Sequence, residues 1–247
     1  MGKIIAVVSG KGGTGKTSLT ACVSLALAAA GYETLALDCD IILRNLDLAL
    51  GLSDSAVMDF TDVLTRRCTL EEAAVRHRKY PKLSLLCAPL AARDAQFPTI
   101  AMEVLGREIR QRYDYCLIDA PAGLGQGFTL ATAAADSVIV VTTADPAALR
   151  DAQRTVMELR HFPPGQVHLV VNRLQKKMLR SLHSTIDDAM DTAGLPLLGV
   201  IPEDEDIPLA LNRGIPLRDV NYYAQRAYEN IAKRITGARV PLMRARW

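Results

Sequence analysis

Short apolar runs alternate with longer helical patterns along most of this 247-residue chain. The first run, Ile4–Val8, is wholly apolar and predicts a strand buried on both faces. Ser18–Ala30 is rich in alanine and leucine, which predicts a helix that Gly31 ends. The other predicted strands are Thr34–Asp38, Leu83–Cys87, Tyr115–Asp119, Ser137–Thr142, Val167–Val171 and Leu197–Val200.

This alternation predicts an α/β fold, with a mostly parallel central sheet and helices on both of its faces. We expect residues 1–237 to form a single domain and residues 238–247 to form a short basic tail. Ligands of such sheets bind at the carboxyl ends of the strands. Gly10, Asp38 and Asp119 all lie at such ends, so we expect them to converge.

The loop between the first strand and the first helix reads Gly10-Lys11-Gly12-Gly13-Thr14-Gly15-Lys16-Thr17. It fits G-x-x-x-x-G-K-[ST], the P-loop that holds phosphates. The glycines let backbone N–H groups turn inward, and the helix N-terminus adds partial positive charge. Lys16 would pair with the β- and γ-phosphates, and the Thr17 hydroxyl would bind Mg²⁺.

The same loop fits a second pattern, the dinucleotide fingerprint G-x-G-x-x-G, through Gly10, Gly12 and Gly15. Acidic residues follow at the expected spacing of roughly 20 residues. A dinucleotide turn has no use for Lys16 and a metal-binding hydroxyl, however. This difference favours a nucleoside triphosphate, and a second motif supports the choice.

That second motif is Tyr115–Asp119, an apolar strand that ends in a carboxylate, as in a Walker B strand. Asp119 would hold Mg²⁺ through a water molecule. Gly123 follows shortly afterwards and would offer its N–H to a γ-phosphate. The P-loop and this strand together predict nucleoside-triphosphate binding.

Three charged residues near the loop have more than one interpretation. Lys11 is either solvent-exposed or a phosphate ligand, and as a ligand it would reach a nucleotide bound by a neighbouring molecule. Asp38 and Asp40 alternate along a strand and so share one face. Asp40 would position the attacking water. For Asp38, a metal-binding role and a structural hydrogen-bonding role remain equally open.

Composition excludes several other classes of protein. The formal net charge is only +2, so bulk charge does not favour nucleic acid, and we do not expect DNA binding. The five cysteines are scattered without a C-x-x-C pair, which argues against an iron–sulfur or zinc site and for a reducing compartment. We expect no signal peptide and no transmembrane helix, and therefore a cytoplasmic protein.

Taken together, these motifs resemble a known family. The pattern K-G-G-x-G-K-T is similar to the deviant Walker A loop of the MinD/ParA ATPases, which are P-loop NTPases of the SIMIBI type. Asp38-x-Asp40 followed by Leu43–Leu48 and Gly51 resembles the MinD branch in particular, as does Asp59–Leu64. Asp119–Gly123 is similar to the family's switch II, and the match runs in order from residue 3 to about residue 240.

The resemblance implies an ATPase that binds ATP or ADP with Mg²⁺ and forms a homodimer when ATP is bound. Lys11 would contact the partner's phosphates, Lys16 its own phosphates, and Asp40 the lytic water, which makes these three the expected catalytic residues. The expected metal site comprises Thr17, Asp38, Asp40 and Asp119. The expected nucleotide contacts are Gly10, Lys11, Gly12, Gly13, Thr14, Gly15, Lys16, Thr17, Ser18, Asn45, Gly123, Asn172, Arg173, Pro202, Glu203 and Asp204.

The resemblance also implies partners. Leu149–Asp151 is similar to a helix that contributes to binding the septation inhibitor MinC, so we expect a MinC-like inhibitor and an activating protein. Tyr223–Ile235 predicts the last core helix, and the tail after Gly237 is too short for a stable membrane-binding helix. Peripheral attachment to the inner face of the cell membrane through this tail would therefore be weak.

The sequence departs from the family pattern in one loop, and two alternative functions remain open. Ile41-Ile42 stands where the family usually has Ile-Gly, which predicts a stiffer or differently shaped loop. The first alternative is a ParA-like or flagellar-number positioning ATPase that acts on the nucleoid or the pole. The second is a small-molecule enzyme on the same fold, such as an ATP-dependent ligase or a nitrogenase-like reductase.

Overall fold

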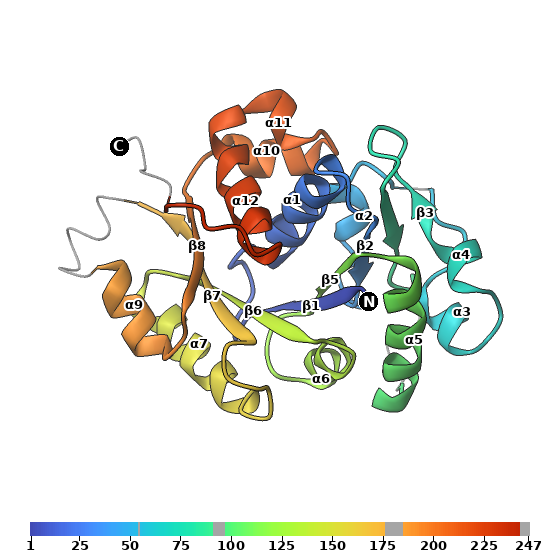
Figure 1. Cartoon of the computed structure of the whole chain (residues 1–247), viewed down its shortest axis with the longest axis horizontal. Helices are drawn as coiled ribbons and strands as arrows, with labels where there is room; N and C mark the ends of the chain where they lie inside the picture. Colours follow the sequence, from blue (N-terminus) through green and yellow to red (C-terminus); the bar gives the residue numbers. More distant parts are fainter. Residues whose placement is uncertain (54, 91–96, 176–184, 243–247) are drawn as a thin grey trace.

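The computed structural model describes residues 1–53, 55–90, 97–175 and 185–242 (Figure 1). Within these ranges one eight-stranded sheet has the order β3-β4-β2-β5-β1-β6-β7-β8. All neighbouring strands are parallel except β3 and β4, which are antiparallel. The strands are β1 (Lys3–Val8), β2 (Thr34–Asp38), β3 (Val75–Arg76), β4 (Leu83–Leu86), β5 (Tyr115–Asp119), β6 (Ser137–Thr143), β7 (Val167–Leu174) and β8 (Leu197–Pro202).

Helices cover both faces of this sheet, as Figure 1 shows. One face carries α1 (Lys16–Ala29), α2 (Leu46–Ala49), α10 (Asp206–Asn212), α11 (Leu217–Val220) and α12 (Tyr222–Ile235). The other carries α5 (Thr99–Arg112), α6 (Gln126–Ala133), α7 (Pro146–Glu158) and α9 (Ile186–Ala193), with α3 (Phe60–Leu64) and α4 (Leu70–Ala73) at its end.

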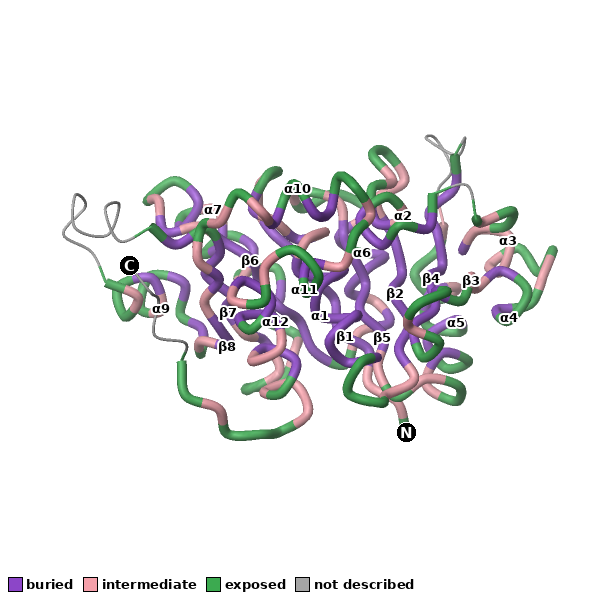
Figure 2. The backbone as a smooth tube through the Cα atoms, turned by 90° about the horizontal axis from the view of Figure 1, so that it is seen from above, coloured by how far each residue is buried: buried purple, intermediate pink, exposed green. Residues whose placement is uncertain are grey.

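The central strand β1 explains why the sheet is covered twice. Ile4, Ala6 and Val8 belong to the core beneath α5, α6 and α7, whereas Ile5 and Val7 belong to the core beneath α1 and α12. A strand that is apolar at every position has two faces to remove from water. Figure 2 shows the result, with buried backbone running through the middle of the molecule and exposed backbone along its rim.

The predicted sheet is confirmed, with differences at its boundaries. Helix α1 begins at Lys16, two residues before the predicted start, because left-handed Gly15 turns the loop directly into the helix. Strand β7 continues past Val171 to Leu174. Strand β3 was not predicted, since two residues are too few to produce a recognisable period.

The C-terminal helix is also confirmed, because Ala227, Tyr228 and Ile231 of α12 are buried. The Arg234 guanidinium donates hydrogen bonds to the carbonyls of Leu198 and Val240, which fixes the chain just after this helix. Residues 243–247, the last part of the predicted tail, lie outside the described residues. Among the helices described, none is both long and apolar enough to cross a bilayer.

Candidate nucleotide-binding site

The P-loop joins the end of β1 to the start of α1, and its backbone requires glycine. Gly15 has φ 96°, and a Cβ there would lie 2.0 Å from the Nδ2 atom of Asn172. At Gly10, a Cβ would lie 2.6 Å from the carbonyl oxygen of Asp151 in α7. Because α7 and β7 approach the loop this closely, larger residues at these two positions would displace it.

Lys16 is buried at the base of the loop with only 7% of its surface exposed. Its Nζ donates a hydrogen bond to the Ser9 hydroxyl at 2.9 Å. Burial lowers the pKa of Lys16, while the carboxylates of Asp119 and Asp40 act in the opposite direction. A desolvated ammonium whose hydrogen-bond partner is a neutral hydroxyl favours an incoming anion such as phosphate.

The Thr17 hydroxyl donates to Oδ2 of Asp119 at 2.6 Å, and Thr20 donates to the other oxygen at 3.5 Å. Burial raises the pKa of Asp119 to about 7 despite these two bonds and the nearby Lys16. Asp38 is paired in register with Asp119 on the adjacent strand. Burial and then the charge of Asp119 raise the pKa of Asp38 to about 8. Two buried carboxylates therefore lie side by side at the edge of the sheet.

This arrangement fits a hard divalent cation. The described residues contain no group of three or more His, Cys, Asp or Glu arranged for a metal ion. Mg²⁺ bound with a nucleotide does not need one, because it takes one or two protein oxygens and completes its shell with phosphates and water. The Thr17 hydroxyl and the desolvated Asp119 carboxylate are oxygen donors of that kind.

Asp38 and Asp40 both hold the loop that follows β2. Asp38 accepts the backbone N–H groups of Asp40 at 2.9 Å and Leu46 at 3.2 Å, which is the structural role considered above. Asp40 accepts the N–H groups of Ile42 at 3.2 Å and Leu43 at 3.0 Å. Both carboxylates are therefore engaged with backbone, and their predicted metal and water roles remain predictions.

The loop that contains Ile41-Ile42 turns at Arg44. Arg44 adopts φ 41°, whereas neither isoleucine has a positive φ. The Arg44 guanidinium then bonds Asp47 at 3.0 Å. Asn45 occupies the N-cap of α2 without a capping side-chain bond, so its amide is not used to cap the helix.

On the other side of β1, Lys11 is held by α7. Its Nζ lies 3.3 Å from Oδ1 of Asp145, the N-cap residue of that helix. Burial would raise the pKa of Asp145, but hydrogen bonds from Thr143, the Ala148 N–H and Lys11 outweigh it and keep the pKa below its usual value. Lys11 is thus paired within its own chain.

The loop after β5 also contacts the P-loop, since the Gly123 N–H donates to the Ser9 carbonyl at 3.2 Å. Asn172 at the end of β7 donates to the Thr14 carbonyl at 2.7 Å and accepts the N–H of Arg173 at 2.9 Å. Gly123 and Asn172 are therefore brought to the predicted site.

The segment after β8 is directed elsewhere. Glu203 follows Pro202, and its N–H donates to the Leu174 carbonyl at 3.2 Å. Asp204 accepts a hydrogen bond from the Asn221 amide at 3.0 Å, and Asn221 caps α12. Asp204 also accepts the N–H of Asp206 at 3.0 Å, so the contacts of Glu203 and Asp204 are made to β7, to the start of α10 and to the last helix. Their predicted role in holding the base remains a prediction.

Sequence analysis missed two residues of this site. Ser9 receives Lys16 and donates its own hydroxyl to the Lys11 carbonyl at 2.7 Å. Asp145 pairs with Lys11. The only sequence signal for Asp145 was Asp145-Pro146, a helix-start pattern. That pattern marks a cap and does not reveal a lysine 134 residues away.

A P-loop on a parallel sheet, with a buried lysine and a Thr–Asp pair at its end, defines a P-loop NTPase. A family model described as an AAA domain matches residues 2–163. The chain belongs to the MinD family and is a MinD-like cell-division ATPase. It is 37% identical over 246 residues to the septum site-determining protein MinD of Synechocystis, covering 98% of this chain and 92% of that protein.

Solved structures agree with this assignment. MinD in the MinC:MinD cell division complex of Aquifex aeolicus matches with a TM-score of 0.90 and 34% identity, covering 98% of each chain. MinD of Pyrococcus horikoshii, complexed with Mg-ADP, matches with a TM-score of 0.83 and 29% identity. That match covers 97% of this chain and 100% of the Pyrococcus chain.

Proposed function

We propose that this chain binds ATP with Mg²⁺ at the P-loop and uses hydrolysis to switch between a dimer and a monomer during placement of the division site. The observation that carries this proposal is the desolvated Lys16 beside the Thr17–Asp119 pair. The Mg-ADP complex of the Pyrococcus relative supports the choice of ligand.

Each residue at the base of the loop has a role in this proposal. Lys16 contacts the phosphates of its own nucleotide, and the loop N–H groups hold their oxygens. Thr17 and Asp119 would hold the Mg²⁺, which would supply positive charge that neutralises the phosphates.

Asp40 orients the attacking water in the proposed reaction. Its carboxylate now accepts the N–H groups of Ile42 and Leu43, and both of these residues have highly exposed side chains. Nucleotide binding would have to redirect the carboxylate toward the phosphates. The loop is suited to such a change because Ile42 and Leu43 are not packed into either core, although Ile41 packs against one of them.

Lys11 contacts the phosphates of the partner protomer in the proposed dimer. To do so it must leave Asp145, and a half-exposed ion pair of this kind is worth only about 0.2–1 kcal/mol. Binding a triphosphate across the dimer interface is sufficient to replace such a pair.

A MinC-like inhibitor is the proposed partner, supported by the MinC:MinD complex of the Aquifex relative. Membrane attachment and an activating protein complete the proposal and rest on the family alone. Deleting Met243–Trp247 and sedimenting the protein with anionic liposomes tests whether this tail is the anchor. Unchanged ATP-dependent sedimentation would exclude it.

The test of the proposed switch is the mass of the protein in solution, measured by light scattering. We expect a dimer with Mg²⁺ and a slowly hydrolysed ATP analogue, and a monomer with ADP. A monomer under both conditions, with normal ATP turnover, would exclude the dimer switch while leaving the ATPase assignment intact.

A further inference from the structure

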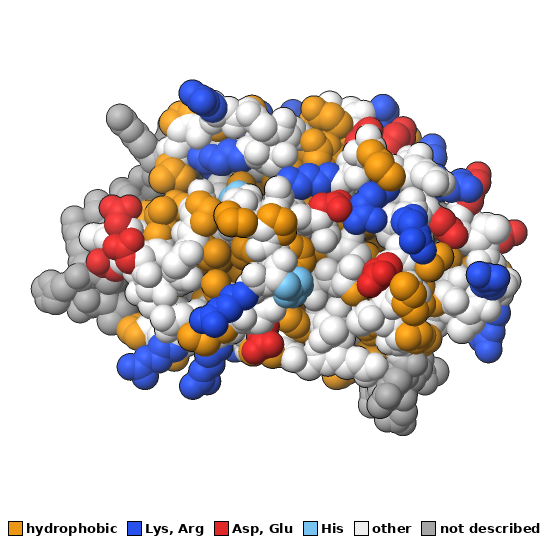
Figure 3. All heavy atoms as spheres, turned by 60° about the horizontal axis from the view of Figure 1, so that its bottom comes forward, with side chains coloured by type: hydrophobic (Ala, Val, Ile, Leu, Met, Phe, Trp, Pro, Cys, Tyr) orange, Lys and Arg blue, Asp and Glu red, His pale blue; other side chains and the backbone are white. Residues whose placement is uncertain are grey.

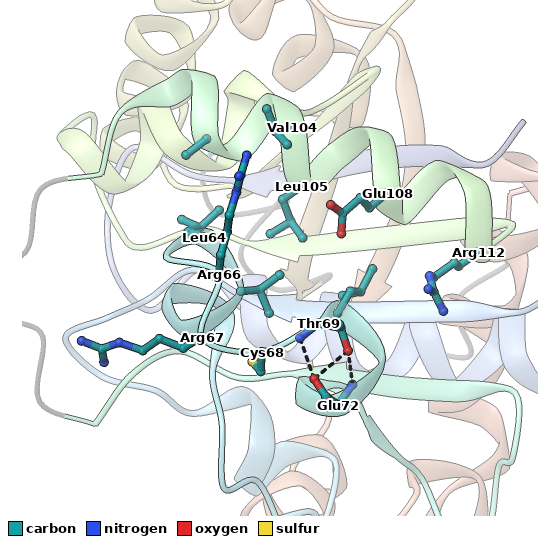
Figure 4. Close-up of a pocket in the computed structure, with 13 residues that line it drawn as sticks. Leu64, Arg66, Arg67, Cys68, Thr69, Glu72, Val104, Leu105, Glu108 and Arg112 are labelled. Atoms are coloured by element: carbon teal, nitrogen blue, oxygen red, sulfur yellow. Dashed lines mark hydrogen bonds between the residues drawn. The ribbon is translucent and has the colours of Figure 1, made fainter.

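A cavity of about 740 Å³ lies between α3, α4 and α5, at the end of the molecule that carries β3 (Figure 4). Its apolar walls include Val63, Leu64 and Leu105. Arg66 and Arg112 reach it from opposite sides. The cavity shares no lining residue with the P-loop. Its size is within the range of small-molecule sites.

The backbone of Arg66 has an unusual conformation. Arg66 has φ 58° at the C′ position after α3, where its N–H bonds the Val63 carbonyl at 3.0 Å and the Arg67 N–H bonds the Asp62 carbonyl at 2.8 Å. This pair of bonds is a Schellman motif, in which C′ is usually glycine. Other helices of this chain follow that rule: α1, α2, α10 and α12 have Gly31, Gly51, Gly214 and Gly237 at C′, all with positive φ.

The guanidinium of Arg66 also lacks a counter-charge. Within the part of the chain that is described, Arg66 forms no salt bridge, whereas Arg67 pairs with Asp62 at 3.5 Å and Arg112 with Glu71 at 2.8 Å. The Glu72 carboxylate accepts the N–H and hydroxyl of Thr69, which hold it at the start of α4. Glu108 lies on α5 between Val104 and Arg112 (Figure 4). Among the described arginines that line the cavity, Arg66 is therefore the one without an ion pair.

Apolar surface is exposed beside Arg66. Figure 4 shows the Arg66 side chain extending toward α5 near Val104. Val104 is 39% exposed, although it lines the cavity, and neighbouring Leu64 is only partly buried. An unpaired guanidinium beside accessible apolar walls is complementary to a molecule that carries a negative charge on an apolar body.

We propose that this cavity binds an amphipathic anion, namely a carboxylate or phosphate attached to an aliphatic or aromatic body. Arg66 holds the anionic group, and the apolar walls from α3 and α5 hold the body. The site accounts for an arginine at a left-handed C′ position, where four other helices of the chain have glycine, since strained residues cluster at ligand sites.

Dodecanoate and dodecyl phosphate, used below their micellar concentrations, are the probes that test the site. Titration calorimetry with the full-length protein gives the affinity, and methyl NMR of Val63, Leu64, Val104 and Leu105 gives the location. Three compounds serve as controls. Acetate and inorganic phosphate carry the anionic group without the alkyl chain, and dodecyltrimethylammonium carries the alkyl chain with a positive charge. We expect the two amphipathic anions to bind at least about tenfold more tightly than these controls, the ratio expected of one charge-assisted hydrogen bond.

The variant Arg66→Gly distinguishes a loss of probe binding from a loss of folding stability. Glycine relieves the positive φ, so we expect a higher Tm together with at least about tenfold weaker probe binding. Arg66→Lys retains the charge and should retain most of the affinity. Arg107→Ala is the matched control, because it removes an exposed cation of α5 that does not line the cavity.

Unchanged affinity in Arg66→Gly would overturn the proposal, as would equal binding of dodecyltrimethylammonium or methyl shifts confined to other parts of the protein. ADP distinguishes this site from the P-loop, since it should not displace dodecanoate. Arg66→Gly should also hydrolyse ATP at the wild-type rate, so the result does not depend on the proposed switch.

Discussion

Lys11 Nζ lies 3.3 Å from Oδ1 of Asp145, and the same oxygen accepts the backbone N–H of Ala148 at 2.9 Å. The leading lysine of the P-loop is therefore attached to the first turn of α7 in the same protomer. Any role for Lys11 in a neighbouring protomer begins with the loss of this contact.

Asp145→Asn should strengthen ATP-dependent dimerisation. Asparagine still caps α7, but it removes the charge that holds Lys11. With an ion pair worth about 0.2–1 kcal/mol per protomer, we expect the dimer dissociation constant to fall by up to about fivefold per released lysine. Analytical ultracentrifugation with a slowly hydrolysed ATP analogue measures this constant.

Asp145→Ala is the control for this experiment, because it removes the cap as well as the charge. It should lower the free energy of unfolding by about 1 kcal/mol. If Asp145→Asn dimerises no more tightly than the wild type, the contact with Asp145 does not limit the availability of Lys11 for the dimer interface.

Lys16→Ala and Lys11→Ala should impair different properties, namely ATP affinity in the first variant and dimerisation in the second. Removing Lys16 deletes a buried charged partner of the phosphates, so we expect the affinity for ATP to fall by about 10- to 150-fold. Removing half-exposed Lys11 should leave ATP affinity within about threefold of wild type, the scale of a surface charge, and abolish the dimer. Calorimetry and light scattering on both variants separate these effects, and equal losses of ATP affinity would contradict the assignment.

Much of this site follows from local sequence. Gly10–Thr17 lies between an apolar run and a helical run, so the strand, loop and helix were predicted together. The short helix at Phe60–Leu64 was also predictable, and Asp59 and Asp62 form a capping box at its start. In each case the interactions lie within a few residues of one another along the chain.

The missed contacts depend on packing between distant segments. Asn172 reaches Thr14 across 158 residues, and Lys11 reaches Asp145 across 134. No spacing rule links such pairs before the strand order is known. The left-handed Arg66 was missed for the opposite reason, since its local sequence lacks the glycine that signals this turn.

Asn172→Ala should loosen the P-loop. The substitution leaves the buried Thr14 carbonyl without its amide partner, at a cost of about 1–3 kcal/mol in the free energy of unfolding. Urea denaturation measures this cost. Gly15→Ala provides a coupled test, because its methyl group would collide with Asn172.

In the double variant Gly15→Ala/Asn172→Ala the collision is absent but the positive φ of residue 15 remains strained. We therefore expect the double variant to be more stable than the sum of the two single effects predicts. Strict additivity would show that the close approach of Asn172 is not what constrains Gly15.

Asp40→Ala should slow ATP hydrolysis by about 10²- to 10⁴-fold, the usual contribution of a group that activates water. The dimer with ATP should accumulate, because its breakdown requires hydrolysis. Asp47→Ala is the matched control, since it removes the Arg44 ion pair and loosens the same loop without touching the water. Equal slowing in both variants would assign the effect to loop conformation.

The strand order places the residues of the candidate site on both sides of β1. Strands β2 and β5 deliver Asp38 and Asp119, whereas Asn172 lies in β7, and β6 and β8 lead into the segments that carry Asp145 and Asp204. In the proposed mechanism, the carboxylates near the metal thus come from one half of the sheet, and the residues proposed to hold Lys11 and the base come from the other half. A substitution in the second half would then change the choice of base without moving Asp38 or Asp119.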